Sequence, residues 1–313
     1  MRIIMFVGWG GIWPVPILKN LLANNDIEIV KIYSQGIHKE KIKNYSKFYS
    51  ENYRDNVEAV IRKSRFKKYE VIKSANEKLV VDYLKRTGFD YIFTLGFGEI
   101  FKKEFINASS GKIINFHPGL LPENCGSDPN ISSLISGNKG GVSLHYIDEG
   151  IDSGEVILKK EIMLSSDETY NSLQLKLSLF TCSLLPEFLA TLKFGNIVAV
   201  KQNLSERTYY PKVSKSDKEV LFSMTAKQIK HMIRTFSGLY EKAFFVFNDV
   251  VVYAGNCESV TLVNNYVAGE FVDQGLDYII FACSDGAVIF SDLRVNDYGP
   301  EQSLIELQRI YDE

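Results

Sequence analysis

An asparagine and a histidine stand two residues apart in the stretch GKIINFHPG, residues 111–119. The apolar residues before them predict a strand, and Pro118 ends it because proline cannot donate to a sheet ladder. Asn115 and His117 then project to one side of the strand at its carboxyl end, where open α/β sheets bind ligands. An imidazole can move protons near neutral pH, and an amide can donate to an oxygen that gains negative charge. The pair therefore indicates an acid/base site.

A carboxylate close to the histidine would hold the imidazole in one orientation. The turn DEGIDSG supplies three candidates, Asp148, Glu149 and Asp152. Each of these residues is also ordinary turn chemistry when taken singly. The residue types alone therefore predict an acid/base site with an unspecified substrate.

Composition narrows the class of protein. The chain has 313 residues, 45% hydrophobic and 24% charged, with a formal net charge of −2, so general electrostatic attraction for nucleic acid or an anionic membrane is disfavoured. The four cysteines are widely separated and lack zinc-site spacing, so we expect free thiols and no metal. The N-terminus lacks a signal peptide pattern, and no run approaches the roughly 18 apolar residues of a membrane helix. These features favour a cytoplasmic protein.

Strand and helix patterns alternate in the first third of the chain, which predicts an α/β domain with a mostly parallel sheet and flanking helices. Strands are expected at 2–7, 27–35, 90–97 and 111–117, and on both sides of the turn at 148–154. Helices are expected at 14–24, from about 76 to 88, at 128–136, and from a capping-box pattern at Ser165 and Glu168 to about 193. We assign residues 1–203 to this domain.

The pattern changes after Asn203. Residues 205–218 have the polar, irregular composition of a linker, a helix is expected near 224–238, and short β-rich runs follow. Ser284-Asp285-Gly286 between two apolar runs is a hairpin signal. Residues 204–313 are therefore expected to form a linker, a helix and a small β-rich barrel or sandwich.

Three sequence blocks resemble the folate-dependent formyltransferases, the family that includes methionyl-tRNA and nucleotide-sugar formyltransferases. They are FTLGFGEIF, GKIINFHPGLLP and GVSLHYIDEGIDSGEVI, within residues 90–163, and the family's Asn-x-His-Pro-x-Leu-Leu-Pro signature is intact. The spacing of 35 residues between His117 and Asp152 also fits the family. The resemblance implies a Rossmann-like N-terminal domain, an OB-like C-terminal barrel, and a catalytic triad of Asn115, His117 and Asp152.

The reaction that the resemblance implies is transfer of a formyl group from N10-formyltetrahydrofolate, the cosubstrate, to an amine. Asn115 would stabilise the oxyanion, His117 would take the amine's proton or share the first role, and Asp152 would orient His117. Two loops are implied to bind the folate, chiefly through backbone groups. Their residues are Gly98, Glu99 and Phe101 in the first loop and Ile147, Asp148, Glu149 and Gly150 in the second. Some relatives have Arg in place of Glu99, which leaves backbone contacts intact.

The identity of the amine depends on weaker signals. The segment RTYYPKV and the β-rich end resemble the second domain of the tRNA and sugar enzymes, and the slightly acidic chain disfavours tRNA. We therefore expect a nucleotide-linked amino sugar, a dTDP- or UDP-amino-deoxysugar for surface polysaccharide (lipopolysaccharide O-antigen) synthesis. Tyr210 and Lys212 are candidates for holding its diphosphate, or are solvated linker residues.

Trp9 and Trp13, in GWGGIWPVP, would line the acceptor pocket or pack the first loop. That stretch lacks GxGxxG, so a nicotinamide enzyme is disfavoured. His38, His145 and His231 are expected to be structural, and Cys125, where many relatives have Arg, is expected to be a filler. The alternatives left open are a methionyl-tRNA formyltransferase and a binding protein that has lost catalysis. Exposed β-edges favour a homodimer.

Overall fold

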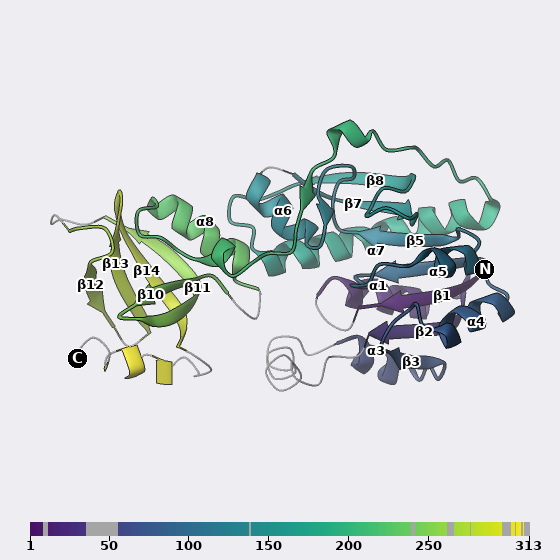
Figure 1. Cartoon of the computed structure of the whole chain (residues 1–313), viewed down its shortest axis with the longest axis horizontal. Helices are drawn as coiled ribbons and strands as arrows, with labels where there is room; N and C mark the ends of the chain where they lie inside the picture. The colour runs from purple at the N-terminus through teal and green to yellow at the C-terminus, as the bar shows by residue number, and fades with distance from the viewer. Residues whose placement is uncertain are drawn as a thin grey trace. The chain divides into compact units, whose positions relative to one another are not determined.

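The computed structural model describes residues 1–8, 12–35, 56–137, 139–238, 242–261, 266–275, 277–295, 302–303, 305–307 and 309 (Figure 1). The chain divides into two compact units. The first comprises residues 1–164 and 173–212, and the second comprises residues 165–172 and 213–313. Trp9 and His38 lie outside the described residues.

The first unit is built on a seven-stranded sheet with the order β3-β2-β1-β4-β5-β7-β8. The first five of these strands are parallel, and β7 and β8 are antiparallel to their neighbours. The mostly parallel sheet expected from the sequence is thereby confirmed. The strand bounds are β1 Arg2–Val7, β2 Glu28–Gln35, β3 Tyr69–Ile72, β4 Tyr91–Leu95, β5 Ile113–His117, β7 Lys139–Tyr146 and β8 Val156–Met163.

Central β1 is apolar along almost its whole length, and residues 3–7 are fully buried, as a parallel strand covered on both faces requires. On one face, Ile92 of β4 and Ile113 of β5 pack with side chains of α4 and α5. On the other face, Phe188 of α7 contacts Phe93 and Phe116, with ring centroids 6.1 and 5.8 Å apart. Strand alternation thus places Thr94 and Asn115 on the α4/α5 face.

The helices of this unit follow the expected order. Helix α3 falls in the charged segment 37–69, where loop and helix are expected, and α5 is an addition that the sequence did not predict. Their bounds are α1 Pro14–Ala23, α3 Val57–Ser64, α4 Lys78–Arg86, α5 Lys103–Ala108, α6 Pro129–Ser136 and α7 Tyr170–Phe194, with the short helix η1 at Leu204–Glu206. The two-residue strands β6 (Cys125–Gly126) and β9 (Tyr209–Tyr210) pair in parallel. Strand β9 therefore lies against the loop that follows β5.

Two expectations about α7 were wrong. The helix begins at Tyr170 and not near Ser165: the backbone N–H of Ser172 donates to Oγ1 of Thr169, which makes Thr169 the cap. By length and composition, α7 is also apolar enough to cross a membrane, although no such run was expected. It buries Leu173, Leu177, Leu185 and Phe188, which is the pattern of a core helix.

The second unit contains a five-stranded antiparallel sheet with the order β10-β11-β14-β13-β12. Its elements are η2 Ser216–Lys218, α8 Ala226–Phe236, β10 Phe244–Phe247, β11 Val250–Val260, β12 Phe271–Gln274, β13 Tyr278–Cys283 and β14 Gly286–Val295. Phe245, Phe281 and Phe290 pack against one another in its core. Cys283 pairs with Gly286 around the predicted hairpin turn. The small β-rich domain expected from the sequence is confirmed.

Candidate active site

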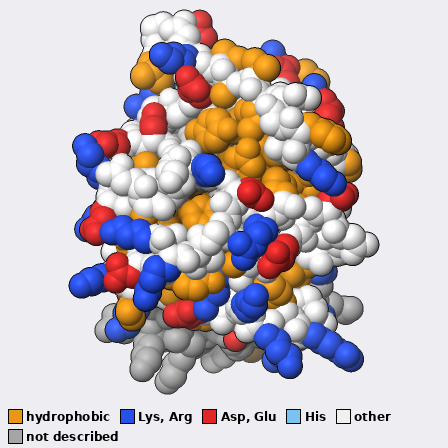
Figure 2. All heavy atoms as spheres, turned by 90° about the vertical axis from the view of Figure 1, so that its right-hand side faces the viewer, with side chains coloured by type: hydrophobic (Ala, Val, Ile, Leu, Met, Phe, Trp, Pro, Cys, Tyr) orange, Lys and Arg blue, Asp and Glu red, His pale blue; other side chains and the backbone are white. Residues whose placement is uncertain are grey.

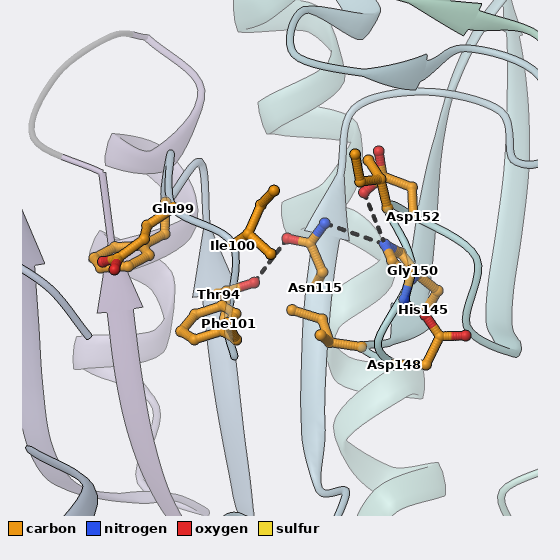
Figure 3. A pocket seen from close by; sticks show the side chains of 12 residues that line it. Thr94, Glu99, Ile100, Phe101, Asn115, His145, Asp148, Gly150 and Asp152 are labelled. Carbon is orange, nitrogen blue, oxygen red and sulfur yellow. Dashed lines mark hydrogen bonds and ion pairs between the residues drawn. The ribbon is translucent and has the colours of Figure 1, made fainter. Parts of the chain in front are cut away.

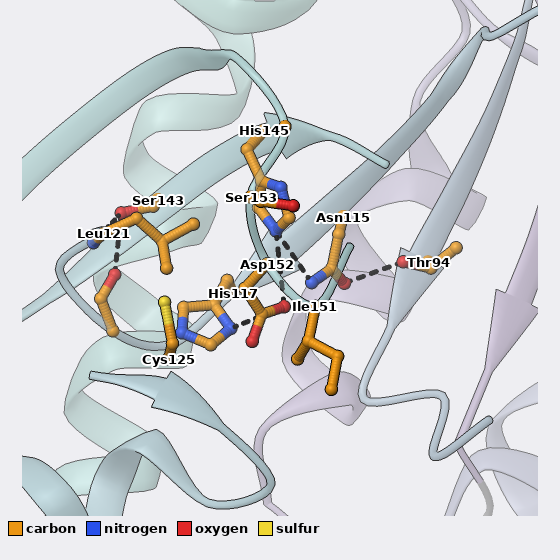
Figure 4. Close-up of polar contacts among 12 residues, drawn as sticks. Thr94, Asn115, His117, Leu121, Cys125, Ser143, His145, Ile151, Asp152 and Ser153 are labelled. Carbon is orange, nitrogen blue, oxygen red and sulfur yellow. Dashed lines mark hydrogen bonds and ion pairs between the residues drawn. The ribbon is translucent and has the colours of Figure 1, made fainter. Parts of the chain in front are cut away.

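Three polar side chains lie in a row across three adjacent strands (Figures 3 and 4). Asn115 on β5 is paired with Thr94 on β4 and with His145 on β7. The hydroxyl of Thr94 donates to Oδ1 of Asn115 at 2.7 Å, and Nδ2 of Asn115 lies 3.1 Å from Nε2 of His145. The amide of Asn115 is therefore held at both its ends.

The neighbours of His145 define which of its ring nitrogens carries the proton. Its Nδ1 lies 2.8 Å from the carbonyl oxygen of Tyr146, which can only accept, so Nδ1 carries the hydrogen. Burial, helped by the positive charge of His117 when it is protonated, lowers the pKa of His145 to about 4. At neutral pH, Nε2 is an acceptor for one N–H of Asn115, and the second amide N–H of Asn115 stays available.

Asp152 lies between the two imidazoles of the site (Figure 4). Its Oδ1 is 3.8 Å from Nδ1 of His117 and 3.8 Å from Nε2 of His145, and its Oδ2 accepts a 3.0 Å bond from the backbone N–H of Gly126. The Nε2–H of His117 donates to the carbonyl oxygen of Asn124 at 3.0 Å. The predicted triad residues thus converge, together with the loop after β5.

Glycine is required where the backbone packs closely around these residues. A Cβ on Gly154 would lie 1.9 Å from the carbonyl oxygen of Tyr146, and a Cβ on Gly119 would lie 2.8 Å from Nε2 of His117. The first clash involves backbone atoms, so no side-chain movement could relieve it. These glycines let the turn after Asp152 and the loop after His117 approach the strands.

The segment after α7 holds the turn that carries Asp152. The side-chain Nε2 of Gln202 lies 2.7 Å from the carbonyl oxygens of both Asp152 and Gly154. A guanidinium nitrogen of Arg207 donates to the carbonyl oxygen of Ile151 at 3.0 Å. Asp152 has a φ of 51°, in the left-handed region that is unfavourable for a residue with a side chain. These bonds stabilise that conformation.

An open pocket, whose empty space of about 520 Å³ includes volume open to solvent, lies in front of this row of side chains (Figure 3). Its polar lining includes Asn115, His145 and Asp152, and its lining residues do not include His117, which is only 4% exposed. The remaining lining residues are Thr94, Phe97, Glu99, Ile100, Phe101, Ile147, Asp148, Gly150 and Ile151. In this geometry the side chain of Asp152 contacts the pocket directly, whereas His117 contacts Asp152 and not the pocket itself.

The structure brings most of the predicted folate residues to this pocket. Glu99, Phe101, Ile147, Asp148 and Gly150 line it. The carboxylate of Glu99 is turned to the loop before α4, where it accepts bonds from the side chain of Ser74, the backbone N–H of Ala75 and the side chain of Asn76. It therefore braces the pocket wall.

Two predicted residues lie outside the lining. The backbone N–H of Gly98 donates to the side chain of Gln35 at 3.1 Å, and Glu149 forms an exposed 3.2 Å ion pair with Lys103. In the second loop, the carboxylate of Asp148 accepts from the backbone N–H of Gly150 at 3.0 Å. That bond fixes the shape of the turn that presents Gly150 to the pocket.

The candidate acceptor residues occupy different surroundings. Trp13 is buried, and its backbone is bonded to Gln174 and Ser178 of α7, which fits the packing alternative. Tyr210 in β9 pairs with Gly126, whose N–H binds Asp152, and Lys212 is exposed two residues later. Cys125 is buried, and burial raises the pKa of its thiol, which fits a filler.

His117, His145 and Asp152 could also hold a metal ion, because their ligand atoms lie within 4.8 Å of one another. Both histidines bond a backbone carbonyl through the other ring nitrogen, an arrangement common among metal-binding histidines. The same contacts equally fit a site that moves protons.

Sequence reasoning missed several residues of the pocket. His145 was expected to be structural, yet it binds Asn115 and lines the pocket. The others are Thr94, Phe97, Ile100 and Ile151. His145 could have been recognised as a site residue only from its cross-strand pairing with Asn115, and a single sequence does not show that pairing.

Comparisons with known proteins identify the family of the chain. The formyl transferase family model matches residues 1–189, and the model of the formyl transferase C-terminal domain matches residues 212–300. The chain belongs to the formyl transferase family. The resemblance inferred from the Asn-x-His-Pro signature is thereby confirmed.

Curated relatives of this formyl transferase include two methionyl-tRNA formyltransferases. The protein of Clostridioides difficile is 29% identical over 228 residues, which cover 72% of this chain and 73% of that protein. The protein of Finegoldia magna is 26% identical over 286 residues, covering 90% of this chain and 89% of that protein.

Solved structures share the fold of this formyl transferase at lower identity. The sugar 3N-formyl transferase WlaRD, determined in the presence of dTDP and 5-N-formyl-THF, is 18% identical with a TM-score of 0.66, covering 95% of this chain and 99% of that chain. An N-formyltransferase of Helicobacter canadensis, in complex with folinic acid and dTDP-3-aminofucose, is 17% identical with a TM-score of 0.65, covering 95% and 100%.

Proposed function

We propose that this formyl transferase moves a formyl group from N10-formyltetrahydrofolate to the amine of a nucleotide-linked amino sugar. The observation that carries the proposal is the placement of the Asn115 amide and the Asp152 carboxylate in one pocket. One group donates a hydrogen bond and the other accepts a proton. Acyl transfer to an amine needs both, because an oxyanion forms while the amine loses a proton.

The reaction can be written with these residues. The acceptor amine attacks the formyl carbon, and the free N–H of Asn115 stabilises the oxygen that becomes negative. Asp152, the carboxylate at the pocket, takes the amine's proton, with His117 behind it to share the charge. The C–N bond to the new acceptor forms, the bond to N10 of the folate breaks, and N10 takes up a proton. His117 thus acts through Asp152, whereas the sequence had suggested the reverse order.

The pocket suits the folate part of the donor. Phe97, Phe101 and Ile147 give it apolar walls on which a flat pterin ring can lie. Gly150 lines the pocket, and its loop would read the polar edge of the pterin through backbone groups other than the Gly150 N–H, which is bonded to Asp148. The solved sugar formyltransferases that share the fold were determined with 5-N-formyl-THF or folinic acid, which supports the same cosubstrate here. The proposed chemistry uses no metal.

The nucleotide-sugar acceptor is supported by charge and by position. The formal charge of −2 offers no general attraction for tRNA phosphates. On the face in Figure 2, Lys and Arg side chains are mixed with Asp and Glu, without a continuous basic area among the described residues. Tyr210 pairs with Gly126 in the loop that touches Asp152, and Lys212 is exposed two residues after Tyr210. A diphosphate could reach both residues while the sugar amine enters the site.

Initiator methionyl-tRNA is the second candidate acceptor, because the curated relatives cited above are methionyl-tRNA formyltransferases. Surface polysaccharide synthesis, a cytoplasmic location and a homodimer belong to the nucleotide-sugar proposal as its expected setting. The first two follow from the soluble, nucleotide-activated substrate that it assigns, and the homodimer is expected from exposed β-edges.

The test is to incubate the chain with N10-formyltetrahydrofolate and, separately, with charged initiator tRNA or a panel of dTDP- and UDP-amino sugars. Formylation is read as a mass gain on the acceptor. Product from an amino sugar supports the proposal, and product from tRNA alone overturns the choice of acceptor. No product from any acceptor, together with no thermal stabilisation by folinic acid, overturns the folate chemistry.

A further inference from the structure

We propose that His145 is a positioning residue that holds the amide of Asn115 in one orientation, so that an N–H of this amide faces the formyl oxygen. The inference rests on the proposed formyl transfer. An asparagine amide can turn by 180° about its last torsion, which exchanges its oxygen and its NH₂ group. Only one of the two orientations offers a donor to an oxyanion, and the other would place an oxygen there.

Thr94 cannot fix this orientation by itself. A hydroxyl group donates or accepts, so Thr94 would satisfy either end of the Asn115 amide. Strand register places Thr94 beside Asn115 on one side and His145 on the other. The direction of the hydrogen bonds must therefore come from His145.

A backbone carbonyl fixes which group donates and which accepts in this series of hydrogen bonds. The oxygen of Tyr146 can only accept, so Nδ1 of His145 donates to it at 2.8 Å. Nε2 of the neutral ring then has only a lone pair, and the group facing it at 3.1 Å must be the NH₂ of Asn115. Oδ1 of Asn115 consequently accepts from Thr94. A chain of one-way bonds thus leaves one N–H of Asn115 for the pocket.

The surroundings keep the ring of His145 in the required form. It is 1% exposed, and burial disfavours its protonated form. His117 opposes a second positive charge, while Asp152 and Asp148 favour one, and burial dominates among these effects. A protonated His145 would present N–H on both nitrogens, and its Nε2–H would face the NH₂ of Asn115.

The first experiment reads the tautomer without any turnover. The chain has four histidines, so ¹⁵N-histidine labelling gives a short spectrum in which His145→Gln identifies the signal of His145. The expected result at pH 7 is a neutral ring protonated on Nδ1. A ring protonated on Nε2, or a charged ring, would overturn the inference even if no acceptor is formylated.

The second experiment reads catalysis. In His145→Leu we expect kcat to fall about 10- to 100-fold, with the KM for the formyl donor within threefold of wild type. The reason is that this variant loses only the fixed orientation of the Asn115 N–H and keeps the folate pocket. His145→Gln, whose side-chain oxygen can accept from Asn115, should recover at least part of that loss. His231→Gln, on α8 of the second unit, is the matched control.

The outcomes separate the two proposals. An inactive wild-type protein refutes the proposed function and leaves the tautomer measurement to decide this inference. An active wild type with kcat unchanged in His145→Leu refutes the inference alone. Thermal unfolding with and without folinic acid shows that each variant is folded and binds the folate. If His145→Leu fails this check, the tautomer measurement decides the inference.

Discussion

The carboxylate of Asp152 accepts a 3.0 Å hydrogen bond from the backbone N–H of Gly126. This bond joins the turn between β7 and β8 to the loop that follows β5, so two sequence blocks that are distant in the chain form one site. It also leaves Oδ1 of Asp152 as the oxygen that faces both imidazoles. One carboxylate oxygen therefore holds the loop, and the other is the one to which the proposed mechanism assigns the proton transfer.

Removing the amide of Asn115 should abolish most of the activity and leave the fold intact. In Asn115→Ala we expect kcat to fall about 10²- to 10³-fold, the typical cost of losing one oxyanion donor. Asn115→Asp places a carboxylate at the same position and should fall at least as far. Steady-state kinetics measure the loss, and unchanged thermal stabilisation by folinic acid serves as the control. Activity within tenfold of wild type in Asn115→Ala would remove this residue from the mechanism.

Replacing Asp152 by Asn separates its charge from its backbone conformation. Asparagine tolerates the left-handed region, so the φ of 51° is retained, whereas alanine at this position adds strain. We expect Asp152→Asn to melt near the wild-type temperature and to lose at least 100-fold in kcat, because no carboxylate remains to take the proton. Asp152→Ala should be inactive and less stable. Equal activity of wild type and Asp152→Asn would exclude the carboxylate as the base.

Gln202 should matter for activity although it lies outside the pocket lining. Gln202→Leu removes two 2.7 Å bonds to the turn of Asp152, at about 1 kcal/mol of net stability for each bond. We expect a loss of about 2 kcal/mol in the free energy of unfolding and a kcat at least tenfold lower. The exposed neighbour variant Lys201→Ala is the control. A stability loss with normal kcat would show that this turn keeps its shape without Gln202.

The buried His145 should make stability fall as the solution is acidified. Its pKa is about 4 in the folded chain against 6.5 when unfolded, so between these values the unfolded chain binds a proton that the folded chain does not. Stability is thus fully present above pH 6.5 and declines toward pH 4, by about 3 kcal/mol from this group. Denaturant unfolding at pH 7 and pH 4.5 should show a smaller decline in His145→Gln. Parallel declines in both proteins would contradict the shift.

Lys212 tests the assigned acceptor. If its ammonium group binds the diphosphate, Lys212→Ala should raise the KM for the nucleotide sugar about tenfold and leave the KM for the formyl donor unchanged. The effect should shrink as salt is added, since an exposed charge is screened. Lys160→Ala, exposed on β8, is the matched control. An unchanged KM for the nucleotide sugar would show that Lys212 is a solvated linker residue that does not bind the diphosphate.

The order of strands and helices in the first unit followed from apolar patterns, and Asn115 and His117 stood out by residue type at a strand end. The choice of Asp152 over its neighbours depended on the family resemblance, because turn carboxylates look alike in sequence. His145 was missed because its meaning lies in antiparallel pairing with β5, which strand periodicity does not reveal. Gln202 was missed because a polar side chain in a linker gives no sign of the backbone carbonyls it binds.

The pairing of β6 with β9 has a practical consequence for dividing the chain. A cut after residue 203 would remove Arg207 and Tyr210 from the fragment that keeps Asn115 and Asp152. Neither half would then hold a complete site. Fragments 1–203 and 204–313 expressed together would regain formyl transfer only by reassociating, which would make the enzyme a complementation reporter for whatever brings two fused partners together.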